Sequence, residues 1–184
     1  TPTVYLEAQV LRCVQILRKK KKYVPDIVMA GGFMSETQIF KSIAMSNLDG
    51  KPCVKAIAMA RAPITAVMKT SYFTELAEKG GLPAEFKQNY GDSLEKFFIC
   101  TTELRERFGE DFKKLPAGAI GLYTYYCDRI ATGLRQLMAG VRKFRLDLLG
   151  RDDLASLTER ATKVTGIPAI EEFEREKMER ILLG

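Results

Sequence analysis

One short stretch, from Pro25 to Gly32, most constrains how this chain of 184 residues folds. Its apolar run ends in the pair Gly31 and Gly32, and a helix start follows at once, with Ser35 and Gln38 in the positions of a capping box. Paired glycines let the backbone approach a ligand closely, and the free N–H groups of a helix start favour an anion. The stretch therefore predicts one half of a phosphate site.

A second predicted strand, Val54 to Met59, ends in a similar way, with Ala60 and then Arg61. The segment 36–45 between the two strands has a helical pattern, and this alternation predicts a right-handed crossover between parallel strands. Ligands of parallel α/β folds bind at the carboxyl ends of the strands, and an arginine there adds a fixed positive charge. The second strand end is therefore the predicted other half of the phosphate site.

Helical patterns account for most of the remaining sequence. The predicted helices are Tyr5–Lys21, Ala62–Lys79, Tyr90–Phe108, Ile120–Leu149, a short helix from Asp152 to Thr162, and Ile170–Leu183. The first has the apolar stripe Leu6, Val10, Cys13, Val14 and Leu17, and the helix over 36–45 has Ile39, Phe40, Ile43 and Ala44. The composition changes from α/β to nearly all helix after Gly80, so we expect two domains, 1–80 and 81–184.

Composition excludes several kinds of chemistry. The chain contains no histidine, which excludes Ser-His-Asp and Cys-His nucleophiles and most zinc catalysis, so any catalysis uses carboxylates, Lys, Tyr, Cys or a bound cofactor. The four cysteines are scattered without a CxxC pair, which predicts no metal site and reduced thiols in the cytoplasm. No apolar run approaches the length of a membrane span.

Two further clusters are open to more than one interpretation. The basic block Arg18 to Lys22 fits a nucleic-acid contact or a solvated helix end, and we favour the helix end because no aromatic residues interleave with the charges. The tyrosines at 123, 125 and 126 with Arg129 fit an aromatic and cationic substrate or redox site. At helical spacing such residues are more often core and interface residues, and we favour that interpretation.

The segments Asp26-Ile-Val-Met-Ala-Gly-Gly-Phe-Met-Ser-Glu and Ala56-Ile-Ala-Met-Ala-Arg resemble the last two β/α units of FMN-dependent TIM barrels. The resemblance is greatest to the FMN-binding domain of the glutamate synthase family. It implies an α/β fold, the C-terminal part of a (β/α)8 TIM barrel followed by a mostly helical extension. It also implies that FMN is the cofactor of an oxidoreductase, and that backbone N–H groups at Gly31, Gly32 and Phe33, and at Ala60 and Arg61, hold its phosphate.

The length of the chain qualifies what the resemblance implies. A complete barrel needs about 250 residues, and only two of its eight strands are recognisable here. We therefore expect the C-terminal portion of a longer protein, or a subunit completed by another chain, with the catalytic residues elsewhere and with an oligomer in solution. The widely separated cysteines after the second strand predict no iron–sulfur cluster. Two alternatives stay open: a non-catalytic barrel-completing or interaction module, and a barrel enzyme that binds another phosphorylated ligand.

Overall fold

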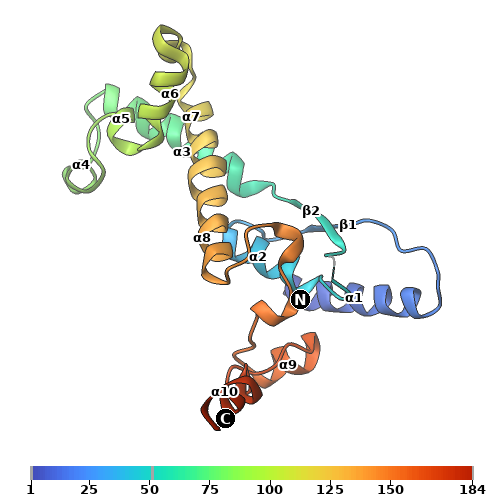
Figure 1. Cartoon of the computed structure of the whole chain (residues 1–184). Helices are drawn as coiled ribbons and strands as arrows, with labels where there is room; N and C mark the ends of the chain where they lie inside the picture. Colours follow the sequence, from blue (N-terminus) through green and yellow to red (C-terminus); the bar gives the residue numbers. More distant parts are fainter. Residues whose placement is uncertain (1, 51, 184) are drawn as a thin grey trace. The chain divides into compact units, whose positions relative to one another are not determined.

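The computed structural model describes residues 2–50 and 52–183, with the backbone alone at residues 176 and 177. Helices make up most of the described chain, and two strands form its one small sheet (Figure 1). The elements are α1 (Thr3–Lys19), β1 (Ile27–Ala30), α2 (Glu36–Met45), β2 (Val54–Ala58), α3 (Arg61–Glu78), α4 (Ala84–Tyr90), α5 (Leu94–Phe97), α6 (Cys100–Phe108), α7 (Ala117–Tyr123), α8 (Gly133–Gly140), α9 (Glu159–Thr165) and α10 (Arg175–Leu183).

Short segments of other helical types join these elements. Three are 3₁₀ turns, η1 (Gly109–Lys114), η3 (Leu146–Leu148) and η4 (Arg151–Asp153). The fourth, η2 (Thr124–Thr132), is a π-helix that continues α7. A π-helix of nine residues is unusual, because this conformation mostly occurs as a single turn within an α-helix.

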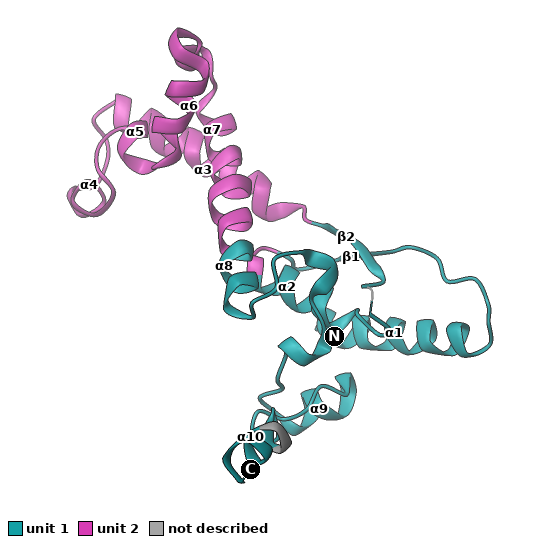
Figure 2. Cartoon of the chain, in the orientation of Figure 1, with its two compact units in different colours: residues 1–33, 37–58, 134–184 teal, residues 34–36, 59–133 magenta. Residues whose placement is uncertain are grey.

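The chain forms two compact units (Figure 2). Unit 1 contains residues 1–33, 37–58 and 134–184, and unit 2 contains residues 34–36 and 59–133. These units follow spatial contacts, whereas the domain division predicted at residue 80 follows composition. The domain division stays a prediction.

The predicted TIM-barrel fold is wrong. In the described residues, β1 and β2 are the only sheet strands, and the chain from α3 onward is helical, so no barrel-like arrangement is present. The sequence pattern predicted one βαβ unit correctly, but a barrel needs eight strands to close, and the described residues after β2 supply no third strand to the sheet. The chain is mostly α, with one parallel pair of strands.

Unit 1 is organised around the parallel pair of β1 and β2, with α2 between them in sequence. Ile27 pairs with Val54 and Ala30 with Ala58, so both strands end at the same edge of the sheet. The predicted strands and the helix over 36–45 are thus confirmed. The helix α2 packs Phe40 and Ala44 against Met138 of α8 and against Leu149, which is fully buried.

The buried face of α1 differs from the predicted stripe. Leu6 is 52% exposed and Val10 is 39% exposed, whereas Glu7 and Leu11 are buried. Glu7 has a polar partner in this buried position, because the Ser42 hydroxyl of α2 donates to Glu7 Oε1 at 2.9 Å. Burial raises the pKa of Glu7 from 4.5 to about 7, while the bond from Ser42 acts in the opposite direction.

Polar groups also join the loops of unit 1. The Ser46 hydroxyl donates to the Ile43 carbonyl and accepts the Val54 N–H, which connects the end of α2 to the start of β2. The Arg151 guanidinium donates to two carbonyls, Met45 at 3.2 Å and Thr165 at 2.5 Å. Arg151 therefore joins the C-terminal ends of α2 and α9, where the helix dipoles favour a positive charge.

Unit 2 depends on a close approach of two helices, α3 and α7. A Cβ atom at Gly121 would lie 2.1 Å from Thr70 Oγ1 and 3.0 Å from the Ala66 carbonyl oxygen. At Gly118 a Cβ would lie 2.8 Å from Val67 Cγ1. Only glycine fits at these two contacts, so the spacing of Gly118 and Gly121 on one face of α7 sets how closely α3 packs. A second cluster comprises Cys100, Leu104, Phe112 and Ile120.

The predicted helices of the second half are wrong in their extent. The predicted helix 90–108 is two helices, α5 and α6, with an extended Phe98 between them, and α4 precedes it. The predicted helix 120–149 is α7, η2 and α8, and it ends at Gly140. Arg142 then adopts a left-handed backbone, and Phe144, which lies within the predicted helix, is 76% exposed.

Candidate phosphate site

The candidate site lies in unit 1, where β1 ends. Gly31 has a φ of 108° and Gly32 a φ of 77°, conformations that residues with a side chain rarely adopt. Both glycines are exposed. A Cβ at Gly32 would meet only Thr3 Oγ1, at 4.0 Å, so the glycines are required by backbone conformation and leave the peptide groups open to a ligand.

A threonine of the first helix orients this backbone. The Thr3 hydroxyl donates to the Gly31 carbonyl at 2.7 Å. In a trans peptide the carbonyl and the following N–H point in opposite directions, so this bond directs the Gly32 N–H away from Thr3. Within the described part of the chain, the N–H groups of Gly32 and Phe33 donate to no backbone acceptor. These two N–H groups are therefore the candidate donors to an anion.

The N-terminus of α1 lies beside the glycines, because Thr3 is its first residue. Tyr5 and Leu6 donate to the Pro2 carbonyl, whereas the N–H groups of Thr3 and Val4 precede any partner within the helix. No acidic residue occupies the first turn of this helix, which has 17 residues. The Gly31 carbonyl accepts from Thr3 at this end of α1, and the positive end of the helix dipole is a second feature of unit 1 that favours negative charge near the turn.

Thr3 and the α1 terminus were not predicted from the sequence, because the predicted helix begins at Tyr5. Pro2 was the available signal: proline favours the start of a helix, and here it is the residue that precedes α1. Phe33 follows the glycines and is buried. The structure thus brings three of the predicted residues, Gly31, Gly32 and Phe33, together as one turn after β1.

The other two predicted residues, Ala60 and Arg61, belong to unit 2. Ala60 directly precedes α3, and Arg61 is the first residue of that helix and is exposed. The structure describes each half of the predicted phosphate site within its own unit. Their cooperation in one site stays a prediction.

Structural partners are found for Cys53, Cys100, Tyr123 and Tyr125. Cys100 Sγ lies 2.7 Å from Thr124 Oγ1, and burial raises the pKa of both Cys53 and Cys100, which disfavours the reactive thiolate. Tyr123 donates to Glu103, whereas Tyr125 is buried and donates to the Met34 carbonyl at 3.0 Å. Among the described residues, no group of three His, Cys, Asp or Glu is placed to hold a metal ion.

None of the helices in residues 2–50 and 52–183 combines the length and the apolar character that crossing a membrane requires. No protein-family model matches the chain, and no curated protein or solved structure does.

Proposed function

We propose that this chain anchors the phosphate of FMN, and that it does so as part of a flavin-dependent oxidoreductase of the glutamate synthase type. The observation that carries the proposal is the turn after β1, where, among the described residues, the N–H groups of Gly32 and Phe33 have no backbone acceptor and Thr3, the first residue of α1, contacts the Gly31 carbonyl. Such an arrangement suits a phosphate dianion, because it supplies several donors and the positive end of a helix.

The residues present fit the phosphate group of FMN. Gly31 and Gly32 have no side chains to block its approach, and the Thr3 hydroxyl holds the intervening peptide in position. Bound FMN would supply the electron-transfer chemistry, while this chain would bind and orient it. The flavin ring would be held by further protein, in the same or another chain. Because Cys13 and Cys127 are exposed free thiols, we propose the cytoplasm as its compartment.

The test compares FMN with riboflavin, which has the same ring and no phosphate. We expect the full chain to bind FMN at least ten times more tightly than riboflavin, measured by quenching of flavin fluorescence. The variant Gly32→Asp places a carboxylate where the phosphate would bind and removes this preference. The matched control is Gly80→Asp, because Gly80 also has a positive φ, 69°, and open space around it.

Equal binding of FMN and riboflavin, or an unchanged preference in Gly32→Asp, would contradict the proposal. A different ligand gives a different pattern. If inorganic phosphate binds the native chain and not Gly32→Asp, while riboflavin and FMN show no binding beyond that of phosphate alone, the anion site stands and its ligand is another phosphorylated compound.

A further inference from the structure

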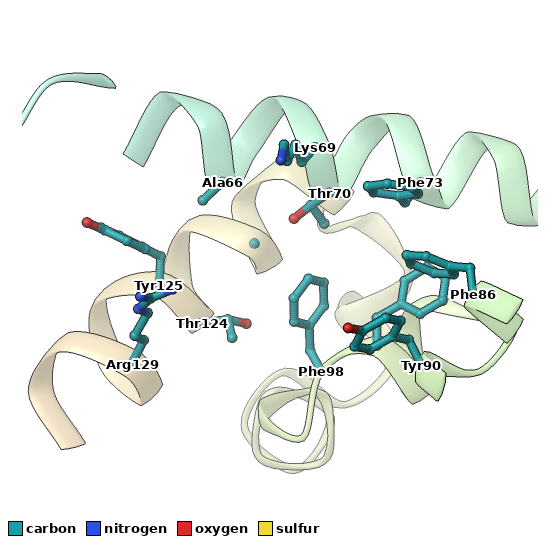
Figure 3. A pocket seen from close by; sticks show the side chains of 12 residues that line it. Ala66, Lys69, Thr70, Phe73, Phe86, Tyr90, Phe98, Thr124, Tyr125 and Arg129 are labelled. Atoms are coloured by element: carbon teal, nitrogen blue, oxygen red, sulfur yellow. The ribbon is translucent and has the colours of Figure 1, made fainter. Parts of the chain in front are cut away.

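Unit 2 contains a cavity that the proposed phosphate site does not use. Its volume is about 430 Å³, which is within the range of small-molecule sites. Aromatic rings from α3, α4 and the α5 segment form much of its wall, and Figure 3 shows Phe98 directed toward the space between α3 and α7. A cavity of this size and lining accommodates a planar apolar molecule.

The rings form one connected cluster around Phe86. Its centroid lies 4.7 Å from that of Phe73, with the planes nearly parallel at 13°, and 5.6 Å from that of Phe97, edge to face. Tyr90 is the third neighbour, at 5.0 Å. Phe73, Phe86 and Phe97 are only half-buried, so apolar ring surface faces the cavity. Stacking on such rings favours a flat aromatic ligand.

Two cations complete the wall, Lys69 from α3 and Arg129 from η2. Both are exposed, and in the described part of the chain neither forms an ion pair. No described residue lining the cavity carries a carboxylate. The charge of the lining is therefore positive only, which favours an anionic ligand.

The π-helix η2 accounts for the position of the arginine. Its hydrogen bonds join residues five apart, which aligns Arg129 with Thr124, another lining residue. Tyr125 in the same segment is fixed by its bond to the Met34 carbonyl. In Figure 3, Arg129 lies toward one end of the cavity and Phe86 and Tyr90 toward the other. A ligand with an apolar ring at one end and a negative charge at the other matches this order.

We infer that the cavity of unit 2 binds an aromatic organic anion: its ring stacks among Phe73, Phe86 and Phe98, and its carboxylate or sulfonate pairs with Lys69 and Arg129. This inference concerns a second site and goes beyond the proposed anchoring of FMN phosphate. Tyr125 and Arg129 belong to the group of residues whose sequence pattern also fits an aromatic and cationic substrate site. The cavity gives that site a class of ligand, an aromatic organic anion.

The test uses two dyes with the same ring system, anilinonaphthalene sulfonate and its uncharged counterpart phenylnaphthylamine. We expect the full chain to bind the sulfonate at one site, at least ten times more tightly than the neutral dye. The double variant Lys69→Met/Arg129→Leu should weaken sulfonate binding about tenfold, the effect of two exposed ion pairs, and leave the neutral dye unchanged. Tyr90→Ala, which removes an exposed ring, should weaken the binding of both dyes.

The matched control is Lys41→Met/Arg135→Leu, which removes two exposed cations of unit 1 and should leave both dyes unaffected. Equal affinity for the two dyes overturns the inference, and so does an equal loss of sulfonate binding in the control. Full sulfonate binding by Lys69→Met/Arg129→Leu also overturns it, because the two cations would then not hold the anion. Circular dichroism of each variant confirms that it is folded.

Discussion

Both units have apolar clusters, but polar side chains also join the elements of unit 1, whereas glycines and aromatic rings do so in unit 2. Ser42 and Glu7 join two helices of unit 1, and Arg151 joins two helix ends. The helices α3 and α7 of unit 2 instead meet at Gly118 and Gly121, where a single added carbon would collide with the opposite helix. The difference implies that pH and charge control the stability of unit 1, and side-chain volume that of unit 2.

The largest expected effect is in unit 2, from Gly121→Leu. Its Cβ would collide with Thr70 and with the Ala66 carbonyl of α3, which is backbone and moves little. We expect a loss of about 4 kcal/mol in the free energy of unfolding. Hydrogen exchange measured by mass spectrometry should locate the loss in α3 and α7.

The matched control is Gly140→Ala in α8, where a Cβ would meet nothing within 4 Å. Removing a helical glycine there should stabilise the protein by up to about 1 kcal/mol. If Gly121→Leu and Gly140→Ala change the free energy of unfolding equally, close packing of α3 and α7 does not control the stability of unit 2.

The next largest effect is the pH dependence caused by Glu7. Its folded pKa of about 7 exceeds the ordinary value of 4.5, so its protonated form stabilises the folded state. That stability is complete below pH 4.5 and is lost as the pH rises through about 7, a difference of about 3 kcal/mol. Glu7→Gln keeps a neutral side chain at every pH, and so should be more stable than the native chain at pH 8.

Urea unfolding at pH 5 and pH 8 checks this expectation. The control is Glu85→Gln, which changes an exposed carboxylate of α4. If the free energy of unfolding of the native chain and of Glu7→Gln changes with pH in parallel, burial of Glu7 does not control the stability of unit 1.

A smaller effect is expected from Arg151→Met. The variant keeps an unbranched apolar stem but loses the guanidinium and its bonds to the Met45 and Thr165 carbonyls, at a cost of about 2 kcal/mol. The control is Arg12→Met, which loses two bonds to the carbonyls of Lys163 and Val164 at an exposed position and should cost less than about 1 kcal/mol. If thermal unfolding shows that Arg151→Met and Arg12→Met lose the same stability, the assigned role of Arg151 is contradicted.

The same comparison explains which parts of the fold could be predicted from the sequence. The strands and α2 follow from local signals: an apolar run, a glycine pair and helical spacing near a capping residue. The extent of α7, η2 and α8 does not, because the π-helix and the end at Gly140 depend on tertiary packing. The barrel prediction failed because one βαβ unit is a local pattern, while barrel closure requires strands distant in sequence.

The candidate site was partly predictable for the same reason. Gly31 and Gly32 carry a signal in the sequence, since two glycines before a helix indicate unusual backbone conformation. Pro2 signals the start of α1 in the sequence, but no sequence signal indicates the hydrogen bond of Thr3, because its acceptor is 28 positions away. The burial of Glu7 was also missed, since a charged residue on a helix is normally expected to be exposed.

The most direct test of the central proposal is a titration of the ¹⁵N-labelled full chain with FMN, followed by amide NMR. The account predicts that the N–H signals of Gly32 and Phe33 shift and saturate, together with those of Thr3 and Val4 at the start of α1. Riboflavin, which lacks the phosphate, should leave these four signals unchanged. If the four signals do not move with FMN, or move equally with riboflavin, the glycine turn after β1 is not a phosphate site.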